Sequence, residues 1–461
     1  ILGLNTRKYH GLLVASLKKP LDRNLLFSKF EEEVSVGKKT YCLGINKYQG
    51  TYSPIGNQYL EGFVFNNYPT FNYKVEGIDI IKSIVMVHDS NAVIISYKMI
   101  TDKPFRFTVK PLINSRDFHS ITKEPEWVFN QTATQRTTVL RPNYEGAPVL
   151  IMGCNKGVYK QKGIWYYDME YEQEMLRGYE YKEDHFCPGE FIIDLRKGVT
   201  TINFLVVGDN VDSAYSTFDN LYSSDEKEYK KFFEYEINRI KSIKNLCYNF
   251  NGIKEDDLLP YLLQATDSFL VTNTTLNTKS VIAGYHWFDN YGRDAMISLP
   301  GLFLVTGRVN EAKELLLSYA KKCKKGLIPN KIKETGEIEY NSVDASLWFI
   351  ISAYKFYKYT NNLEFIRLNL WSKIKEIISY YKLGTDFGII MQSDGLISTD
   401  SDISLTWMDT KYTLRKGKCV EVNALWYNAL KITELFAKRF NEDFDEYLVI
   451  SNMVKKSFSK F

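Results

Sequence analysis

The feature that most constrains the fold is a change of sequence pattern near Ser223. Before this residue, short runs of β-branched and aromatic residues alternate with Gly, Asn, Asp and Pro, as in strands joined by turns. The clearest runs are residues 78–87, 92–97, 105–109 and 201–207. Many short strands without long helical segments between them predict an antiparallel β-sandwich, which we assign to residues 1–222.

After this point, apolar residues recur at helical spacing. Ser223 and Glu226 form a capping-box pattern, so we assign residues 223–250 to a linker helix and residues 251–461 to an all-α domain. The helices expected in that domain, from their periodicity and their start and stop signals, span residues 257–271, 294–305, 310–325, 344–359, 363–383, 420–440 and 443–458.

Composition excludes several classes of protein. The 461 residues are 44% apolar and 25% charged, as in folded globular proteins. A net charge of +4 is too small to predict nucleic-acid binding. No stretch has the ~18 consecutive apolar residues that indicate a transmembrane helix. The six cysteines and five histidines lack the spacing of metal ligands or of a disulfide framework. We therefore expect no metal, no membrane anchor and a reducing, cytoplasmic location.

Three loops between the expected helices combine aromatic and acidic residues. The first, residues 284–296, includes Trp287, Arg293 and Asp294. Aromatic faces stack on the apolar side of a pyranose ring, while carboxylate and guanidinium groups bind its hydroxyls, so this loop predicts a sugar-binding wall. The alternative is that Arg293 and Asp294 form an ion pair that only fixes the loop.

The second loop leads to Asp344 and Trp348, and the third contains Trp407 and Asp409. Asp344 stands at a helix start, where an aspartate also serves as a cap. The intervals between the loops match helix-loop-helix-loop units, so all three loops are expected at one end of a helical barrel. Several carboxylates around a stacking surface suit cleavage of a glycosidic bond. Since desolvation beside a tryptophan favours a protonated carboxyl, Asp409 is the candidate general acid.

Several separate motifs resemble those of one family. They are residues 5–15, 287–294, 326–330, 341–344, 406–409 and 417–428. Together, and in this order, they resemble the signature segments of glycogen debranching enzymes of the amylo-α-1,6-glucosidase type, in the bacterial or archaeal form.

The resemblance implies a β-sandwich followed by an (α/α)6 barrel, as in six-hairpin glycosidases. It also implies inverting hydrolysis of α-1,6-linked glucose stubs on glycogen or another branched α-glucan, without a metal or organic cofactor. The residues that it places at the site are Asp409 as general acid, Arg293 and Asp294 on the released glucose, Asp344 and Glu421 in the pocket lining, and Trp287, Trp348 and Trp407 as stacking surfaces or barrel core.

Two departures from the family pattern change what we expect of this chain. Asn290 and Tyr291 precede Gly292 where the family has an aspartate and a tryptophan. No counterpart of the family's second catalytic glutamate, the general base, is found, and residues 257–461 are too few for all the barrel helices at about 12 residues each. We therefore expect a chain truncated at both ends, with an incomplete barrel and poor activity by itself.

Three alternatives remain open at this level. One is a non-catalytic α-glucan-binding protein that keeps the aromatic walls without turnover. The others are a related glucoamylase, which attacks α-1,4 chains, and a sandwich-plus-barrel phosphorylase, which requires phosphate. Glucose release from α-1,6 and α-1,4 substrates, measured with and without phosphate, separates these alternatives.

Overall fold

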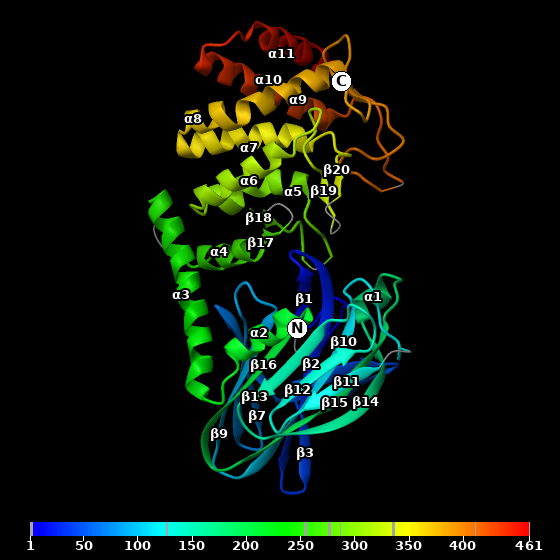
Figure 1. Ribbon diagram of the computed structural model, residues 1–461, viewed down its shortest axis with the longest axis vertical. Helices are drawn as coiled ribbons and strands as arrows, with labels where there is room; N and C mark the ends of the chain where they lie inside the picture. Colours follow the sequence, from blue (N-terminus) through cyan, green and yellow to red (C-terminus); the bar gives the residue numbers. More distant parts are fainter. Residues whose placement is uncertain are drawn as a thin grey trace. The chain divides into compact units, whose positions relative to one another are not determined.

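The computed structural model describes residues 3–125, 128–252, 256–274, 278–285, 287–333, 337–410 and 412–460. The chain forms two compact units, Ile1–Lys241 and Ser242–Phe461 (Figure 1). The first unit contains the two large sheets, and the second consists mainly of helices with short hairpins. The predicted order of antiparallel β-structure followed by helices is therefore confirmed.

The first unit contains two large antiparallel sheets. One sheet has the order β1-β2-β10-β15-β14, with β3 paired to β2. Its strands are β1 (Leu13–Lys18), β2 (Leu21–Val36), β3 (Lys39–Cys42), β10 (Phe105–Asp117), β14 (Val158–Glu170) and β15 (Lys182–Leu195). A small separate hairpin joins β4 (Ile45–Tyr48) to β5 (Thr51–Ile55).

The other sheet has the order β11-β12-β13-β16-β9-β8-β7-β6. Its strands are β6 (Leu60–Asn66), β7 (Tyr68–Val75), β8 (Ile78–Met86), β9 (Ala92–Thr101), β11 (Phe129–Ala133), β12 (Thr137–Pro142), β13 (Val149–Cys154) and β16 (Gly198–Asp209). The four strand runs singled out in the sequence all fall within β8, β9, β10 and β16, apart from one residue at the end of the first.

The two sheets pack face to face through aromatic side chains. Phe30 of β2 lies 4.9 Å from Phe204 of β16, and Phe107 of β10 lies 5.1 Å from Tyr97 of β9, measured between ring centroids. All four rings are buried in one core cluster. Alternating apolar positions on each strand put these rings on the inner faces, which makes the unit a β-sandwich.

Helices also occur in the first unit. They are α1 (Glu172–Leu176), α2 (Val211–Leu221) and the beginning of α3 (Glu226–Asn251). The sequence analysis did not predict α2. This helix buries Ala214 and Phe218 against the outer face of the eight-stranded sheet, where they pack with residues such as Val207.

The second unit contains helices and short hairpins. The helices are α4 (Leu259–Ser268), α5 (Gly292–Leu299), α6 (Val309–Lys321), α7 (Ala345–Thr360), α8 (Leu363–Phe365), α9 (Trp371–Leu383), α10 (Val420–Phe440) and α11 (Asp445–Phe458). Each expected helix is present, and α10 has the predicted bounds. Two π-helical turns, Pro300–Leu304 and Ile366–Leu370, continue α5 and α8.

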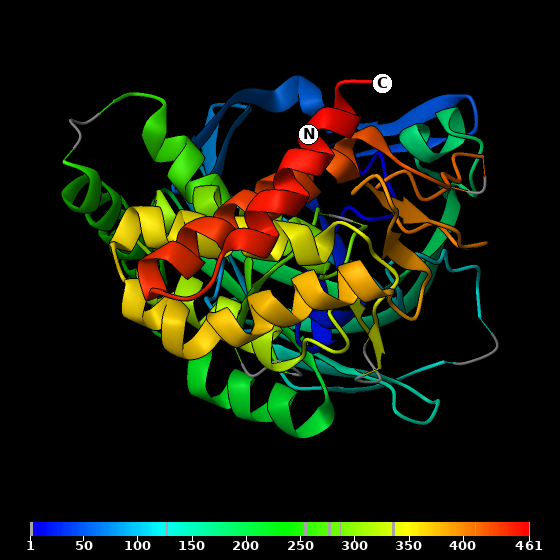
Figure 2. The same cartoon turned by 90° about the horizontal axis from the view of Figure 1, so that it is seen from above.

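Packing in this unit centres on α7 and α10. Helix α10 contacts α7, α9 and α11, and these four helices lie side by side in Figure 2. The hairpins are β17 (Leu270–Asn273) with β18 (Thr278–Val281), β19 (Lys331–Ile332) with β20 (Ile338–Glu339), and β21 (Ile389–Met391) with β22 (Ile397–Thr399). Of the helices in the described residues, none is both long and apolar enough to span a membrane.

Candidate active site

Asn290 anchors the first of the three loops, residues 284–296. Its side chain is buried, and its amide donates hydrogen bonds to the carbonyl oxygen of Val281 at 2.9 Å and to the hydroxyl of Ser280. The hydroxyl of Tyr319 donates to the Asn290 amide oxygen at 3.2 Å. Asn290 therefore uses both ends of its amide to hold the loop, a role that the sequence did not reveal. His286, in the same loop, lies outside the described residues.

Gly292 begins α5 at a point where the backbone of another segment comes close. Its N–H donates to the carbonyl oxygen of Asn330 at 2.8 Å. A Cβ atom at this position would overlap the carbonyl oxygen of Pro329. Only glycine allows the contact, because it has no Cβ. The motif Gly326–Asn330 of the sequence analysis thus supports the start of α5, and with it the next residues, Arg293 and Asp294.

Arg293 forms an ion pair with Asp344. Its Nε lies 2.8 Å from both carboxylate oxygens of Asp344, whose side chain is only 4% exposed. The hydroxyl of Ser342 donates to Asp344 Oδ1 at 2.7 Å and accepts from Arg293 Nη2 at 3.3 Å. The same hydroxyl also accepts the N–H of Ala345 at 3.2 Å. Asp344 therefore orients Arg293, while Ser342 rather than Asp344 caps α7.

Asp294 is half-buried on the first turn of α5 and receives no hydrogen bond from another side chain of the described residues. Burial raises the pKa of the Asp294 carboxyl, Arg293 and its own N–H act to lower it, and the charges of Asp344 and Asp409 raise it further. The carboxyl of Asp294 therefore lies within electrostatic reach of both Asp344 and Asp409. The hydrogen bond from the Gly292 N–H to Asn330 joins the first loop to the segment that leads into the second.

A backbone hydrogen bond joins the second loop to the third. The N–H of Val343 donates to the carbonyl oxygen of Leu405 at 2.9 Å. The third loop then turns tightly, because the Ser404 hydroxyl donates to the Met408 carbonyl oxygen at 2.7 Å. Asp409 follows this turn, and its side chain is exposed. The sequence analysis expected Trp407 to desolvate Asp409, but both residues are exposed, Trp407 to 59%.

Glu421, on the first turn of α10, is engaged by Arg415. The guanidinium binds both carboxylate oxygens, with Nη2 to Oε2 at 2.9 Å. Arg415 Nη1 also lies 3.7 Å from the sulfur of Met408, next to Asp409. Glu421 thus braces the third loop from α10. Sequence reasoning missed both Arg415 and Ser342, although each stands within a few residues of an acidic residue that it had selected.

The three candidate tryptophans differ in their surroundings. Trp348 packs against the core of the second unit, which favours the core interpretation. Trp287 is half-buried, with its ring 6.1 Å from that of Phe288. Trp407 presents most of its ring to solvent, so it is the most open stacking surface of the three. In the described ranges, no three His, Cys, Asp or Glu side chains are grouped to hold a metal ion.

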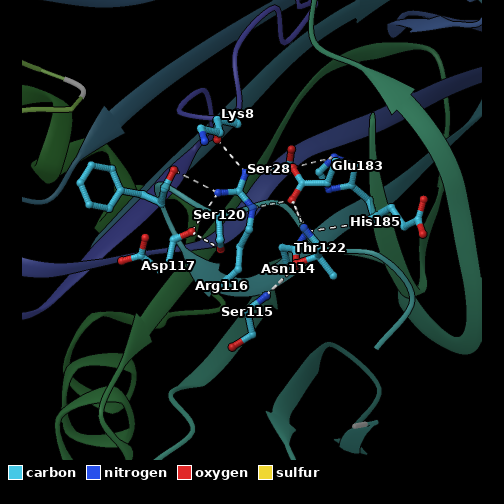
Figure 3. Close-up of polar contacts among 12 residues, drawn as sticks. Lys8, Ser28, Asn114, Ser115, Arg116, Asp117, Ser120, Thr122, Glu183 and His185 are labelled. Atoms are coloured by element: carbon cyan, nitrogen blue, oxygen red, sulfur yellow. Dashed lines mark hydrogen bonds and ion pairs between the residues drawn. The ribbon is translucent and has the colours of Figure 1, made fainter. Parts of the chain in front are cut away.

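A second polar cluster lies in the first unit and holds the N-terminal motif, residues 5–15. Figure 3 shows the guanidinium of Arg116 between the carbonyl of Lys8 and the carboxylate of Glu183. Arg116 Nη2 donates to the Lys8 carbonyl oxygen at 2.6 Å and to Glu183 Oε2 at 2.8 Å, and Nε donates to Oε1. Tyr171 donates its hydroxyl to the same carboxylate, and His185 lies 3.2 Å from that hydroxyl. This cluster fixes the motif from a buried position.

Comparison with known proteins gives two matches to family models and matches to curated relatives, among them a yeast enzyme. Residues 1–202 match the model described as glycogen debranching enzyme N terminal, and residues 264–461 match amylo-alpha-1,6-glucosidase. A segment of 88 residues is 44% identical to the glycogen debranching enzyme of Saccharomyces cerevisiae. That segment is 18% of this chain and 6% of the yeast enzyme.

Solved structures share the fold at low sequence identity. A protein from the human microbiome described as a kojibiose phosphorylase is 12% identical, with a TM-score of 0.53 over 98% of this chain and 60% of its own. A bacterial glucoamylase solved with acarbose is also 12% identical, with a TM-score of 0.54 over 99% of this chain and 67% of its own.

These likenesses establish a shared arrangement of sheets followed by helices. The family follows from the sequence matches, because two models of one family cover residues 1–202 and 264–461 in their expected order. The chain belongs to the glycogen debranching enzyme family.

Proposed function

We propose that this chain is a glycoside hydrolase that removes α-1,6-linked glucose from the branch stubs of glycogen with inversion of configuration. The observation that carries this proposal is the Arg293–Asp344 ion pair beside Asp294, with Asp409 within electrostatic reach of Asp294, in the residues that match amylo-alpha-1,6-glucosidase. On this proposal, the helices of the second unit belong to an (α/α)6 barrel, and its loops form the mouth that receives a terminal glucose.

Arg293 and Asp294 bind the glucose that is released. Asp344 fixes the Arg293 guanidinium through Nε, and Ser342 accepts from Nη2. The remaining guanidinium N–H groups have no acceptor in the described residues and are free to donate to sugar hydroxyls. The Asp294 carboxylate offers acceptors beside them. A fixed donor next to a free acceptor suits a vicinal pair of hydroxyls.

Asp409 is the general acid that protonates the leaving oxygen. Its exposed position suits a group that substrate covers on binding, and the neighbouring Trp407 offers a ring for the incoming sugar. An inverting mechanism also needs a base about 6.5–9.5 Å away that activates water. Asp344 and Glu421 are both held by arginines, so neither is available for this role. We therefore assign the general base to a residue outside residues 341–344 and 417–428, the motifs that contain Asp344 and Glu421.

The role of Asp409 is tested with two substrates that differ in their need for an acid. Asp409→Asn should slow glucose release from an α-1,6 limit dextrin about 100-fold or more, because the alkoxide leaving group needs a proton. The same variant should still hydrolyse α-glucosyl fluoride, whose leaving group needs no protonation. Asp402→Asn is the matched control, since Asp402 is exposed in the same loop and pairs with Lys416. Equal rates for Asp409→Asn and the parent on limit dextrin would reject the assignment.

The substrate class is tested by comparing linkages. On the proposed function, glucose is released from α-1,6 stubs in preference to α-1,4 chains, and phosphate does not change the rate. A preference for α-1,4 chains identifies a glucoamylase instead, and a requirement for phosphate identifies a phosphorylase. Binding of maltooligosaccharide without turnover on any of these substrates identifies a non-catalytic glucan-binding protein.

A further inference from the structure

A cavity of about 590 Å³ lies in the first unit, apart from the three loops described above. It is formed by the end of β8 and the two residues after it, by the end of α2 and the two residues after it, and by the first turns of α3. Its walls include His88, Leu221, Phe232 and Tyr235, and its lining residues all belong to the first unit. The volume falls in the range of about 300–1,000 Å³ that is usual for small-molecule sites.

One side of this cavity is fixed and the other is open. Tyr222 stacks on Phe218 at 4.9 Å between ring centroids, and its hydroxyl donates to the carbonyl oxygen of Cys154 at 2.9 Å. Tyr235, on α3, is 54% exposed, and its ring lies 6.5 Å from that of His88. The cavity therefore combines a rigid aromatic wall with two accessible rings at its mouth.

The charges of the lining neutralise each other. Lys231 Nζ lies 2.7 Å from both carboxylate oxygens of Glu228, and these two residues belong to the same turn of α3. A lining of this kind has no net charge with which to select a phosphate or a cation. The polar groups that remain, among them the amide of Asn220, suit hydroxyls. Aromatic rings with neutral hydrogen-bonding groups fit an amphipathic, uncharged polyol.

We propose that this cavity is a second glucan-binding site, which holds an α-1,4-linked outer chain of the branched polymer. The proposal rests on the proposed function, since it takes the same polymer as ligand. A polymer held at one site raises the effective concentration of its other chain ends at the catalytic site. The site should therefore matter for glycogen and not for a short α-1,6-linked substrate.

The test measures binding of maltoheptaose to the 461-residue chain by titration calorimetry, in an Arg293→Ala background that weakens the catalytic site. Adding Tyr235→Ala should lower the remaining affinity about tenfold or more, as expected when a stacking ring is lost. His88→Ala should lower it as well. Tyr261→Ala is the matched control, because Tyr261 is also a helical tyrosine with 54% exposure. Unchanged affinity in both Tyr235→Ala and His88→Ala overturns the proposal.

Activity separates this proposal from the proposed function. With Arg293 intact, Tyr235→Ala should raise the KM for glycogen and leave kcat/KM for a short α-1,6-linked oligosaccharide unchanged. An equal loss on both substrates would assign Tyr235 to the fold and overturn the second site. If no α-1,6 hydrolysis is seen while Tyr235→Ala still lowers the affinity for maltoheptaose, the proposed function fails and the second site stands.

Discussion

The buried ion pair between Arg116 and Glu183 gives a quantitative prediction about the sandwich. The Glu183 side chain is fully buried, and the Arg116 side chain is 4% exposed. Glu183 also accepts the N–H of Thr122 at 2.9 Å and the amide of Asn114 at 3.2 Å. Burial alone would raise the pKa of the Glu183 carboxyl, yet the Arg116 guanidinium and its other partners hold it below the ordinary value. The carboxylate is therefore charged in the folded protein.

Glu183→Gln removes the negative charge with little change in shape. The Arg116 guanidinium is then left in the interior without a counter-charge, which typically costs about 3–5 kcal/mol. The loss is a large fraction of the roughly 5–15 kcal/mol that stabilises a whole domain. We expect the double variant Arg116→Met/Glu183→Gln to recover part of this loss, because it no longer buries an unpaired charge.

A matched control lies on the same two strands. Arg106 of β10 pairs with Asp194 of β15, with Nε to Oδ1 at 2.7 Å, but both side chains are exposed. Water screens this pair, so Asp194→Asn should change stability little. The stability of both variants is measured in the intact chain by urea unfolding. Hydrogen exchange of peptides from β10 and β15 reports the unfolding of these two strands. A loss in Glu183→Gln no larger than that in Asp194→Asn would refute the reasoning.

Three further outcomes are expected. Burial lowers the pKa of His185 to about 4, against the opposing charge of Glu183, so the unfolded chain takes up a proton at higher pH than the folded chain. The free energy of unfolding should therefore fall as pH drops from about 6.5 to about 4, by roughly 3 kcal/mol in total, and His185→Gln should flatten a plot of urea midpoint against pH. Gly292→Ala should displace the start of α5 and weaken glucose binding measured by calorimetry, because its Cβ would overlap the Pro329 carbonyl oxygen. Glu421→Gln should release Arg415 from α10 and lower kcat more than it raises KM for limit dextrin, whereas equal hydrolysis by this variant and the parent would contradict a bracing role.

Local patterns sufficed to predict the helices of the second unit. Helix α10 ends at Phe440, where the next residue, Asn441, takes the left-handed conformation of a helix C-cap. Helix α2 was missed, although Ala214, Phe218 and Leu221 recur at helical spacing along it. It begins directly after β16, the last strand of the first unit, and its short helical pattern was read as part of the preceding strands.

The candidate site was predicted less completely than the fold. Its acidic residues were selected from the sequence because each stands near a tryptophan or opens a helix, and their roles stay predictions. The partner of Arg293 was not predicted. From the sequence, the adjacent Asp294 is as good a partner for Arg293 as the distant Asp344, which the structure shows to be the partner. Pairing across loops depends on how the helices pack, which a local pattern does not contain. For the same reason, the sequence predicted a shielded Asp409, whereas the side chain is exposed.

The candidate carboxylates differ in whether another side chain of the protein already binds them. Those paired with an arginine hold the loops in place, whereas an unpaired one can bind a substrate hydroxyl. Asp344 is held by Arg293, and Glu421 is held by Arg415. Asp294 lies half-buried between charged neighbours without a side-chain partner in the described residues, and burial raises the pKa of its carboxyl. A carboxylate that loses water and gains few donors costs free energy in the folded protein. On the proposed function, a sugar hydroxyl that donates to Asp294 would offset this cost and would contribute part of the binding free energy.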